Sequence, residues 1–449
     1  MKRLHFTAVV AVMSGCLTGR TRTEYDELVR TAIPEPPPRA PDVSADEASL
    51  ERETRLEVVL RIALLKNPDL AESRERTHAA LARVPAASRL PDLEFKYEQW
   101  AVPLASPFSL DQAQMLMWGL RQSIPAPGSL DARARVALAD AESTVDAERA
   151  RRNEIAAQVR RTYADYYRSY TEYEVHKEHV RLTQAVVDLA RANFRVGRTT
   201  QQDVLRTIVE LSRIHTEIAS VEQELRSSAA LLNALMARPP DAPLGPVPDL
   251  APPAARPQLA ELEHTLLSRR PELAAAVRTV QRSEASLDRA RSEASWPAFM
   301  VGADYWYLPT GTDVRNAWSA MVSVSLPWLN PRHREEVREA EHMVAAEKHA
   351  LASAKNAALY QLRDALARYE AARQAFEVID KDLTPQARQS FEAAQSAFAA
   401  GQAEGLGVLD ALRSYLQVRL DRVRALSRLE SSLADVDRVV GAEVDGGDR

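Results

Sequence analysis

The sequence predicts a mostly α-helical protein with a small β part, built from two internal structural repeats. A Phe-x-x-Gly segment at residues 194–197 recurs 204 positions later, at residues 398–401. Long runs rich in Ala, Arg, Glu and Leu contain little proline or glycine, as extended helices require. Two shorter regions alternate apolar with polar or small side chains, which is typical of strands. Each half of the chain is therefore one structural unit, repeated.

The chain begins with the pattern of a targeting segment, residues 1–15. Lys2 and Arg3 precede an apolar run, and small residues then lead to Cys16, as in a bacterial lipoprotein signal peptide. Cys16 is the only cysteine, so an exported chain cannot use it for an internal disulfide, and this favours lipid attachment. An ordinary secretory signal with an incidental cysteine is the alternative. Residues 16–54 are predicted to be a lipid-anchored tether, and the proline-rich stretch 31–45 within it is predicted to be extended.

The first repeat covers residues 55–237. Its centre is the run 129–194, which has neither proline nor glycine and would span about 99 Å as one helix, at about 1.5 Å per residue. Helices are also predicted over residues 55–89 and 203–237. Placed end to end, these two match the long helix in length, so the repeat can build two parallel rods.

The second repeat covers residues 257–441 and follows the same plan. Helices are predicted over 257–294, 332–400 and 406–441, and Pro385 predicts a kink or local break in the middle one. The remaining segments are a Pro-rich equatorial linker and a flexible C-terminus, residues 238–256 and 442–449.

Two β-hairpins are predicted, at residues 93–124 and 298–327. In the second, Trp318, Ala320 and Val322 alternate with smaller or more polar residues. Strands of about 10 residues with aromatic ends suit a bilayer crossing. The alternative is a pair of half-buried hairpins in a soluble cap.

The number of strands bears on the oligomeric state. Four strands cannot close a barrel with a lumen, and an open sheet edge cannot face lipid because its N–H and C=O groups would lack partners. If the hairpins span a bilayer, three chains would supply twelve strands. We therefore predict a trimeric α-helical barrel continued into a 12-stranded transmembrane β-barrel, with four strands from each chain.

Paired landmarks give the sequence a family resemblance. Residues 67–70 (Asn-Pro-Asp-Leu) match residues 270–273 (Arg-Pro-Glu-Leu), and the second hairpin ends in Ser-Leu-Pro-Trp at residues 325–328. With the duplicated Phe-x-x-Gly turn and the order of elements, the chain resembles the TolC-like outer membrane efflux family over residues 56–441. Its lipoprotein start is similar to the branch that works with resistance-nodulation-division pumps.

The resemblance implies a passive, homotrimeric exit duct in the outer membrane, with its helical part in the periplasm. A periplasmic adaptor, or membrane fusion protein, would join it to an inner-membrane resistance-nodulation-division pump. The cargo would be drugs or heavy-metal cations, between which the sequence does not decide. The alternative function is a lipid-anchored periplasmic coiled-coil scaffold without a pore.

The resemblance also assigns roles to single residues. The tips of two helical hairpins would meet the adaptor, and glycine suits such chain reversals because it readily adopts a left-handed conformation. The tip residues are Val196, Gly197, Arg198 and Thr199 in the first hairpin and Ala400, Gly401 and Gln402 in the second.

Asp410 matches one of the two carboxylates that constrict the lumen in this family, while Gly407 occupies the other position. Three copies of Asp410 near one axis would form a ring of like charge that selects cations. The alternative for Asp410 is a solvated helix residue.

Other functional classes find little support. Positive and negative charges are interspersed, so no basic stripe predicts a nucleic-acid partner. No nucleophile elbow, phosphate-binding loop or zinc signature occurs, so we expect no enzyme activity, cofactor or resident metal. His176 and His179 share one helix face, where transient metal contact or a solvated surface is expected. The tyrosines between residues 163 and 173 predict packing between helices.

Overall fold

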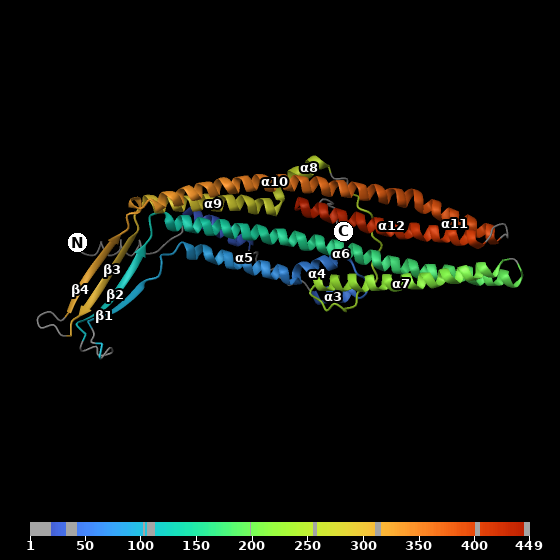
Figure 1. Ribbon diagram of the computed structural model, residues 1–449, viewed down its shortest axis with the longest axis horizontal. Helices are drawn as coiled ribbons and strands as arrows, with labels where there is room; N and C mark the ends of the chain where they lie inside the picture. The colour runs from blue at the N-terminus through green and yellow to red at the C-terminus, as the bar shows by residue number, and fades with distance from the viewer. Residues whose placement is uncertain are drawn as a thin grey trace. The chain divides into compact units, whose positions relative to one another are not determined.

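The computed structural model describes residues 19–32, 43–101, 104–105, 113–197, 199–254, 258–309, 316–399 and 405–443. Within these ranges the chain is mostly helical with one antiparallel four-stranded sheet (Figure 1), which confirms the predicted fold class. The predicted signal peptide, Cys16, Arg198 and residues 400–402 lie outside the described residues.

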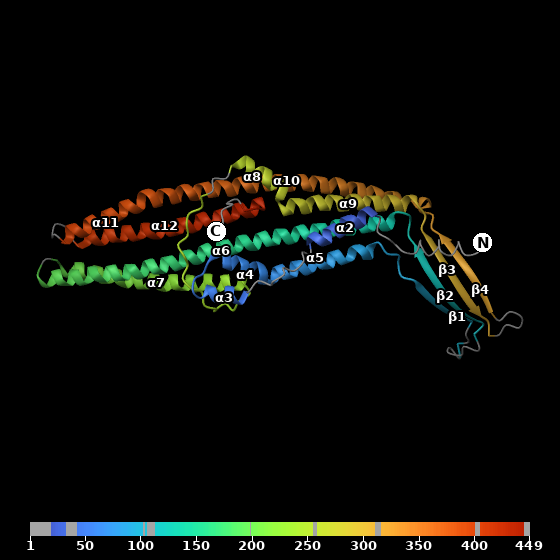
Figure 2. The same ribbon diagram turned by 180° about the vertical axis from the view of Figure 1, so that it is seen from behind.

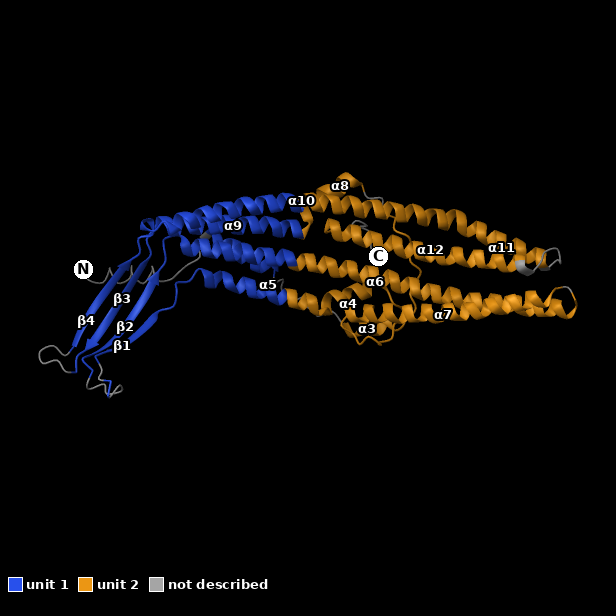
Figure 3. Ribbon diagram, in the orientation of Figure 1, with its two compact units in different colours: residues 1–35, 74–147, 272–354 blue, residues 36–73, 148–271, 355–449 orange. Residues whose placement is uncertain are grey.

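The chain divides into two compact units (Figure 3), and each takes segments from both sequence repeats. The first unit comprises residues 1–35, 74–147 and 272–354, and the second comprises residues 36–73, 148–271 and 355–449.

The first unit contains a helical layer and the sheet. Its helices come from α5 (Pro68–Ala87), α6 (Ser129–Arg195), α9 (Pro271–Ser295) and α10 (Arg332–Val378). Arg135 on α6 donates to Asp288 on α9 at 2.8 Å, so charged pairs as well as apolar contacts join these helices.

The predicted tether contains helices on both sides of its proline-rich stretch, of which residues 33–42 lie outside the described residues. Residues 16–54 contain α2 (Gly19–Ala32) and α3 (Val43–Leu50). Tyr25 and Leu28 of α2 pack against Leu81 and Leu138 of α5 and α6, and Figure 2 shows α2 beside α6. Both helices lie in proline-free stretches, where apolar residues three or four positions apart can bury one helix face. The prolines on either side made this helical pattern hard to recognise in the sequence.

The sheet has the strand order β1-β2-β3-β4. Its strands are β1 (Glu94–Trp100), β2 (Met115–Ile124), β3 (Phe299–Tyr307) and β4 (Asn316–Val324). Every neighbouring pair is antiparallel, and β2 of the first repeat pairs directly with β3 of the second. The two predicted hairpins therefore join into one continuous sheet.

The second unit consists of helices around two apolar cores. Besides parts of α6 and α10 it contains α4 (Leu56–Lys66), α7 (Gln201–Leu235), α8 (Leu259–Arg269), α11 (Thr384–Ala399) and α12 (Gly405–Val440). Tyr163 and Tyr166 lie in one core with Ile62 and Leu232, and the Tyr163 hydroxyl donates to the Thr54 carbonyl at 2.9 Å. The predicted packing role of these tyrosines is confirmed.

Two helices that the sequence predicts as continuous are interrupted. Residues 55–89 form α4 and α5, which are separated at Asn67, and residues 257–294 give α8 and α9, which are separated at Arg270. The following residues, Pro68 and Pro271, lack an N–H group, and a proline pushes the preceding residue out of the helical region. The Asn67 side chain stabilises its break, since it donates to the Leu235 carbonyl at 3.0 Å and accepts from the Asp69 N–H at 3.0 Å.

The second long helix also changes its winding where Pro385 predicts a local break. A π-helical turn, η3 (Ile379–Leu383), separates α10 from α11. The Thr384 hydroxyl donates to the Ile379 carbonyl at 2.7 Å. Pro385 removes one backbone donor, and the wider turn with this hydroxyl compensates for the loss.

Candidate functional site

The strand register gives the sheet an apolar face. Tyr97, Trp118, Tyr305 and Trp318 lie in one row across all four strands. The ring centroids of Tyr97 and Trp118 are 5.9 Å apart, and those of Trp118 and Tyr305 are 6.0 Å apart. This apolar face further contains Phe95, Leu116, Leu120, Phe299, Val301, Ala303, Ala320, Val322 and Val324. Aromatic rows of this kind are common where a strand crosses from lipid to water.

The opposite face of the sheet carries all the charged residues of the four strands, interspersed with glycines, serines, four methionines and two tryptophans. Its register positions include Glu94, Lys96, Glu98, Arg121, Asp304, Ser319 and Ser323, which we call the polar face. Lys96 and Glu98 form an ion pair, and Arg121 Nη2 lies 4.0 Å from Asp304 Oδ1. The two faces therefore suit two different solvents, as the predicted alternation requires.

The sheet ends in two edge strands. Among the described residues, β1 pairs only with β2, and β4 pairs only with β3. Each outer edge therefore presents backbone N–H and C=O groups that can pair with a further strand.

The first predicted tip is a tight reversal between α6 and α7. Gly197 has φ +70°, and its N–H donates to the Phe194 carbonyl at 3.0 Å. This left-handed conformation explains why the reversal needs glycine. Val196 is 66% exposed beside it. Of the predicted tip residues, the structure therefore places Val196, Gly197 and Thr199 at one turn.

A capping box fixes the start of α7 immediately after this turn. The Thr200 hydroxyl accepts from the Asp203 N–H at 3.2 Å, and the Asp203 carboxylate accepts from the Thr200 N–H at 3.2 Å. Thr199 and Thr200 also donate their hydroxyl protons to Asp203. These hydrogen bonds, first that of the Thr200 hydroxyl, lower the pKa of Asp203 below its ordinary value.

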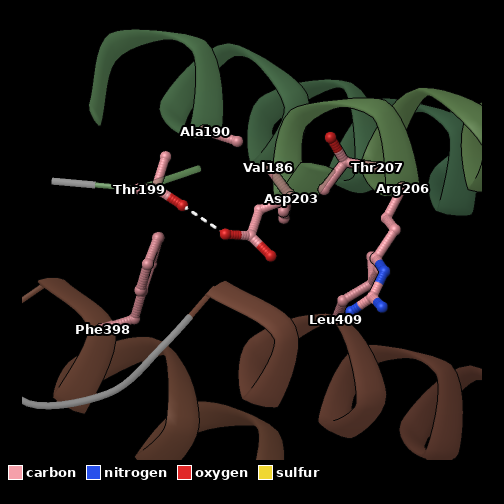
Figure 4. A pocket seen from close by; sticks show the side chains of 8 residues that line it. All are labelled: Val186, Ala190, Thr199, Asp203, Arg206, Thr207, Phe398 and Leu409. Carbon is pink, nitrogen blue, oxygen red and sulfur yellow. Dashed lines mark hydrogen bonds between the residues drawn. The ribbon is translucent and has the colours of Figure 1, made fainter. Parts of the chain in front are cut away.

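The two helical hairpins of the second unit meet in a small pocket (Figure 4). In this view Thr199 points to Asp203, while Phe398 and Leu409 approach from the other hairpin. The remaining lining residues are Val186, Ala190, Arg206 and Thr207. The pocket therefore places the start of α12 beside the first tip.

Asp410 lies near the start of α12. Its side chain is 65% exposed, and its Oδ1 atom is 3.5 Å from Arg413 Nη1. Arg413 also donates from Nε to Glu210 on α7 at 2.8 Å. This hydrogen bond is the main cause that lowers the pKa of the buried Glu210. Asp410 thus belongs to a charged group that links α12 to α7.

Sequence reasoning missed a series of arginines on α12. Besides Arg413, Arg419 donates to Glu178 on α6, Arg422 to Asp380 in η3, and Arg424 to Glu172 on α6. The signal is an arginine repeated along one helix, but the acidic partners lie far away in sequence. These pairs hold α12 to three other elements.

The structure corrects the predicted solvated surface at His176 and His179. Only 4% of His176 and 7% of His179 is exposed, and their rings stack with centroids 6.5 Å apart. Burial lowers the pKa of His176 and lowers that of His179 to about 4. Both histidines therefore stay neutral at neutral pH.

In the described part of the chain, no group of three or more His, Cys, Asp or Glu side chains is arranged to hold a metal ion.

A search of the described helices for one with the length and apolar character to cross a membrane finds none.

Comparisons with known proteins give matches of family and fold. The model of the family described as "Outer membrane efflux protein" matches residues 59–238 and again residues 262–442. A search of the curated proteins finds no match.

Three solved structures are similar in fold. A membrane protein from Pseudomonas aeruginosa is 19% identical, with a TM-score of 0.73 over 92% of this chain and 96% of that chain. VceC from Vibrio cholerae is 18% identical, with a TM-score of 0.70 over 87% of this chain and 96% of that chain. The MtrE channel of Neisseria gonorrhoeae, in its open state, is 19% identical, with a TM-score of 0.67 over 87% of this chain and 90% of that chain.

Proposed function

This chain belongs to the outer membrane efflux protein family, and on that premise we propose that three copies close into one passive exit duct. The family establishes the function predicted from the sequence, an efflux channel of the outer membrane. It also establishes that the chain acts as a channel rather than as an enzyme. The homotrimer, the lipid anchor and the pump partners are our proposal.

The edge strands carry the argument for the trimer. Four strands with two open edges cannot face lipid alone, because unpaired backbone groups are costly there. Pairing of β4 from one copy with β1 of the next removes both edges in every copy. Three copies then form a closed barrel of twelve strands, as a passage through a bilayer requires.

The two faces of the sheet set the orientation of this barrel. The apolar face with its aromatic row at Trp118 and Tyr305 suits lipid, and the polar face with Arg121 and Asp304 suits a water-filled lumen. The soluble-cap alternative would leave the exposed Trp318 and Val322 in water.

We place the adaptor at the hairpin tips. Val196, Leu205 and Val209 are exposed apolar residues at or just after the first reversal. Such residues near a rigid turn can pack against another helical hairpin. The partner is a periplasmic adaptor protein, which joins the duct to an inner-membrane resistance-nodulation-division pump, and the cargo is a drug or a heavy-metal cation.

We assign lipid attachment to Cys16, within an N-terminal signal of lipoprotein type. One acyl chain anchors a protein weakly and reversibly, so the barrel supplies the firm attachment.

A pair of neighbouring cysteine substitutions tests which face meets water. Ser319 on the polar face and Ala320 on the apolar face are adjacent and similar in size. A charged, membrane-impermeant thiol reagent is expected to label Ser319→Cys and not Ala320→Cys in outer membrane vesicles. The wild-type chain, with Cys16 alone, is the labelling control. Equal labelling at both positions would favour the scaffold without a pore.

We further propose that Asp410 lines a constriction of the lumen. Threefold symmetry brings three copies near one axis, where each carboxylate has Arg413 at 3.5 Å as a partial counter-charge. Asp410→Ala is expected to increase single-channel conductance in a planar bilayer and to reduce cation preference. Asp421→Ala, farther along α12, is the matched control. Unchanged conductance and selectivity in Asp410→Ala would rule the ring out.

A further inference from the structure

A charged pair on the polar face of the sheet lies opposite two glycines. The register places Asp304 on β3 directly across from Gly119 on β2, and Arg121 on β2 directly across from Gly302 on β3. Each strand thus contributes one charged residue and one glycine, two positions apart. This reciprocal arrangement joins the two repeats at the centre of the sheet.

The two glycines provide the space that the charged side chains fill. A Cβ atom at Gly119 would overlap Asp304 Oδ1, and a Cβ atom at Gly302 would lie 3.2 Å from Arg121 Cγ. Both side chains therefore lie flat across the surface of the sheet instead of projecting from it. Any larger residue at Gly119 would move the carboxylate outward.

The Arg121 and Asp304 side chains attract each other by charge, and each keeps an atom that could form a further hydrogen bond. Arg121 Nη2 is 4.0 Å from Asp304 Oδ1, and Asp304 is only 7% exposed. Within the described residues, Arg121 Nε and Asp304 Oδ1 have no hydrogen-bond partner. One buried nitrogen of Arg121 and one buried oxygen of Asp304 without such bonds are costly in a structural role alone, and water or a solute in a lumen would satisfy them.

We infer that Arg121 and Asp304, lying over Gly302 and Gly119, form a charged lining that sets the ion preference of the duct within the outer membrane. The inference rests on the proposed barrel with its polar face inward. Three copies then place three positive and three negative charges at one level of the wall. Because the side chains lie flat, they act on passing solutes by charge while the lumen stays wide.

The test is the reversal potential of single channels in a salt gradient. Arg121→Gln removes the positive charge and is expected to raise the cation-to-anion permeability ratio by about twofold, while Asp304→Asn lowers it by a similar factor. The double variant returns toward the wild-type ratio. Each variant is also made with Asp410→Ala, so that selectivity at α12 is not mistaken for selectivity at the sheet.

Glycine substitution tests the flat arrangement separately. Gly119→Ala would displace the Asp304 carboxylate from the sheet surface into the lumen, and it is expected to lower the single-channel conductance. The double variant Gly119→Ala with Asp304→Ala is expected to regain the wild-type conductance. Ser319→Ala, on the other side of Asp304, is the control that leaves conductance unchanged.

The outcomes separate this inference from the proposed function. A wild-type protein that forms no channel would refute the barrel itself. Channels whose reversal potential stays the same in all charge variants and both backgrounds would refute the charged lining and leave the barrel intact.

Discussion

His176 and His179 lie where α6 packs against α7 and α12. His176 Nδ1 and His179 Nε2 are buried without hydrogen-bond partners among the described residues. The nearby charged groups are Glu172 on α6, Glu210 and Glu217 on α7, and Arg413 and Arg424 on α12. The glutamates favour the protonated histidines and the arginines oppose them, but burial outweighs both.

Because these two histidines are buried at this interface, we expect the folded protein to lose stability against unfolding in mild acid. Because the pKa of His179 falls to about 4 in the folded chain, the unfolded chain binds more protons as the pH drops below the ordinary histidine value of about 6.5. Stability is therefore full above that pH and declines as the pH falls toward 4. This decline can be measured as the change in melting temperature of the purified protein at several pH values between 7 and 4.

His179→Phe is expected to flatten this pH dependence, since it removes the titrating group and fills similar space. His215→Phe, at an exposed position on α7, is the matched control and keeps the wild-type slope. Identical slopes in all three proteins would show that other groups set the acid sensitivity.

At the scale of secondary-structure elements, the reversal between α6 and α7 depends on one cap. Thr200 and Asp203 exchange hydrogen bonds at the first turn of α7, whereas Thr199 adds a single hydroxyl contact to the same carboxylate. The cap satisfies backbone N–H groups that the helix leaves free, so it holds the exposed tip in one conformation.

Thr200→Ala is expected to destabilise the start of α7 by about 1 kcal/mol, the usual cost of a lost N-cap. Hydrogen exchange should then speed up in the first turns of α7 and not in α12. Thr199→Ala keeps the reciprocal bonds and should leave most of the protection in place. If both variants exchange at the wild-type rate, the cap does not determine the order of the tip.

The elements differ in how far the sequence could predict them. The glycine- and proline-free run gave α6, and alternation gave the strands, because both patterns repeat along the chain. The breaks at Asn67 and Arg270 depend on proline at the first position of the next helix, which the helical pattern on either side conceals. The helices α2 and α3 were hidden by the prolines around them.

The candidate site residues also differ in how far the sequence could predict them. The glycine at the first reversal could be predicted from the repeat because it belongs to a local motif, while the role of Asp410, taken from the family resemblance, stays a prediction. The pairs Arg121 with Gly302 and Arg413 with Glu210 could not, because they depend on strand register and on helix packing between distant segments. Long-range partners leave no spacing signal in one sequence.

At the scale of the whole molecule, the central claim is that one chain supplies a third of a closed wall. The sheet has two open edges, one apolar face and one polar face. A closed ring of copies would pair both edges, turn the apolar face to lipid and turn the polar face to the water-filled lumen. The lipid that we propose at Cys16 would add an anchor, but the barrel is what would hold the protein in the membrane.

Native mass spectrometry of the protein carrying Cys16→Ala and an ordinary cleavable secretory signal, extracted from outer membranes, tests this claim most directly. We expect a particle that needs detergent, has three times the mass of the mature chain, and separates into single chains on heating. A single chain that remains in plain aqueous buffer as a stable monomer would contradict it.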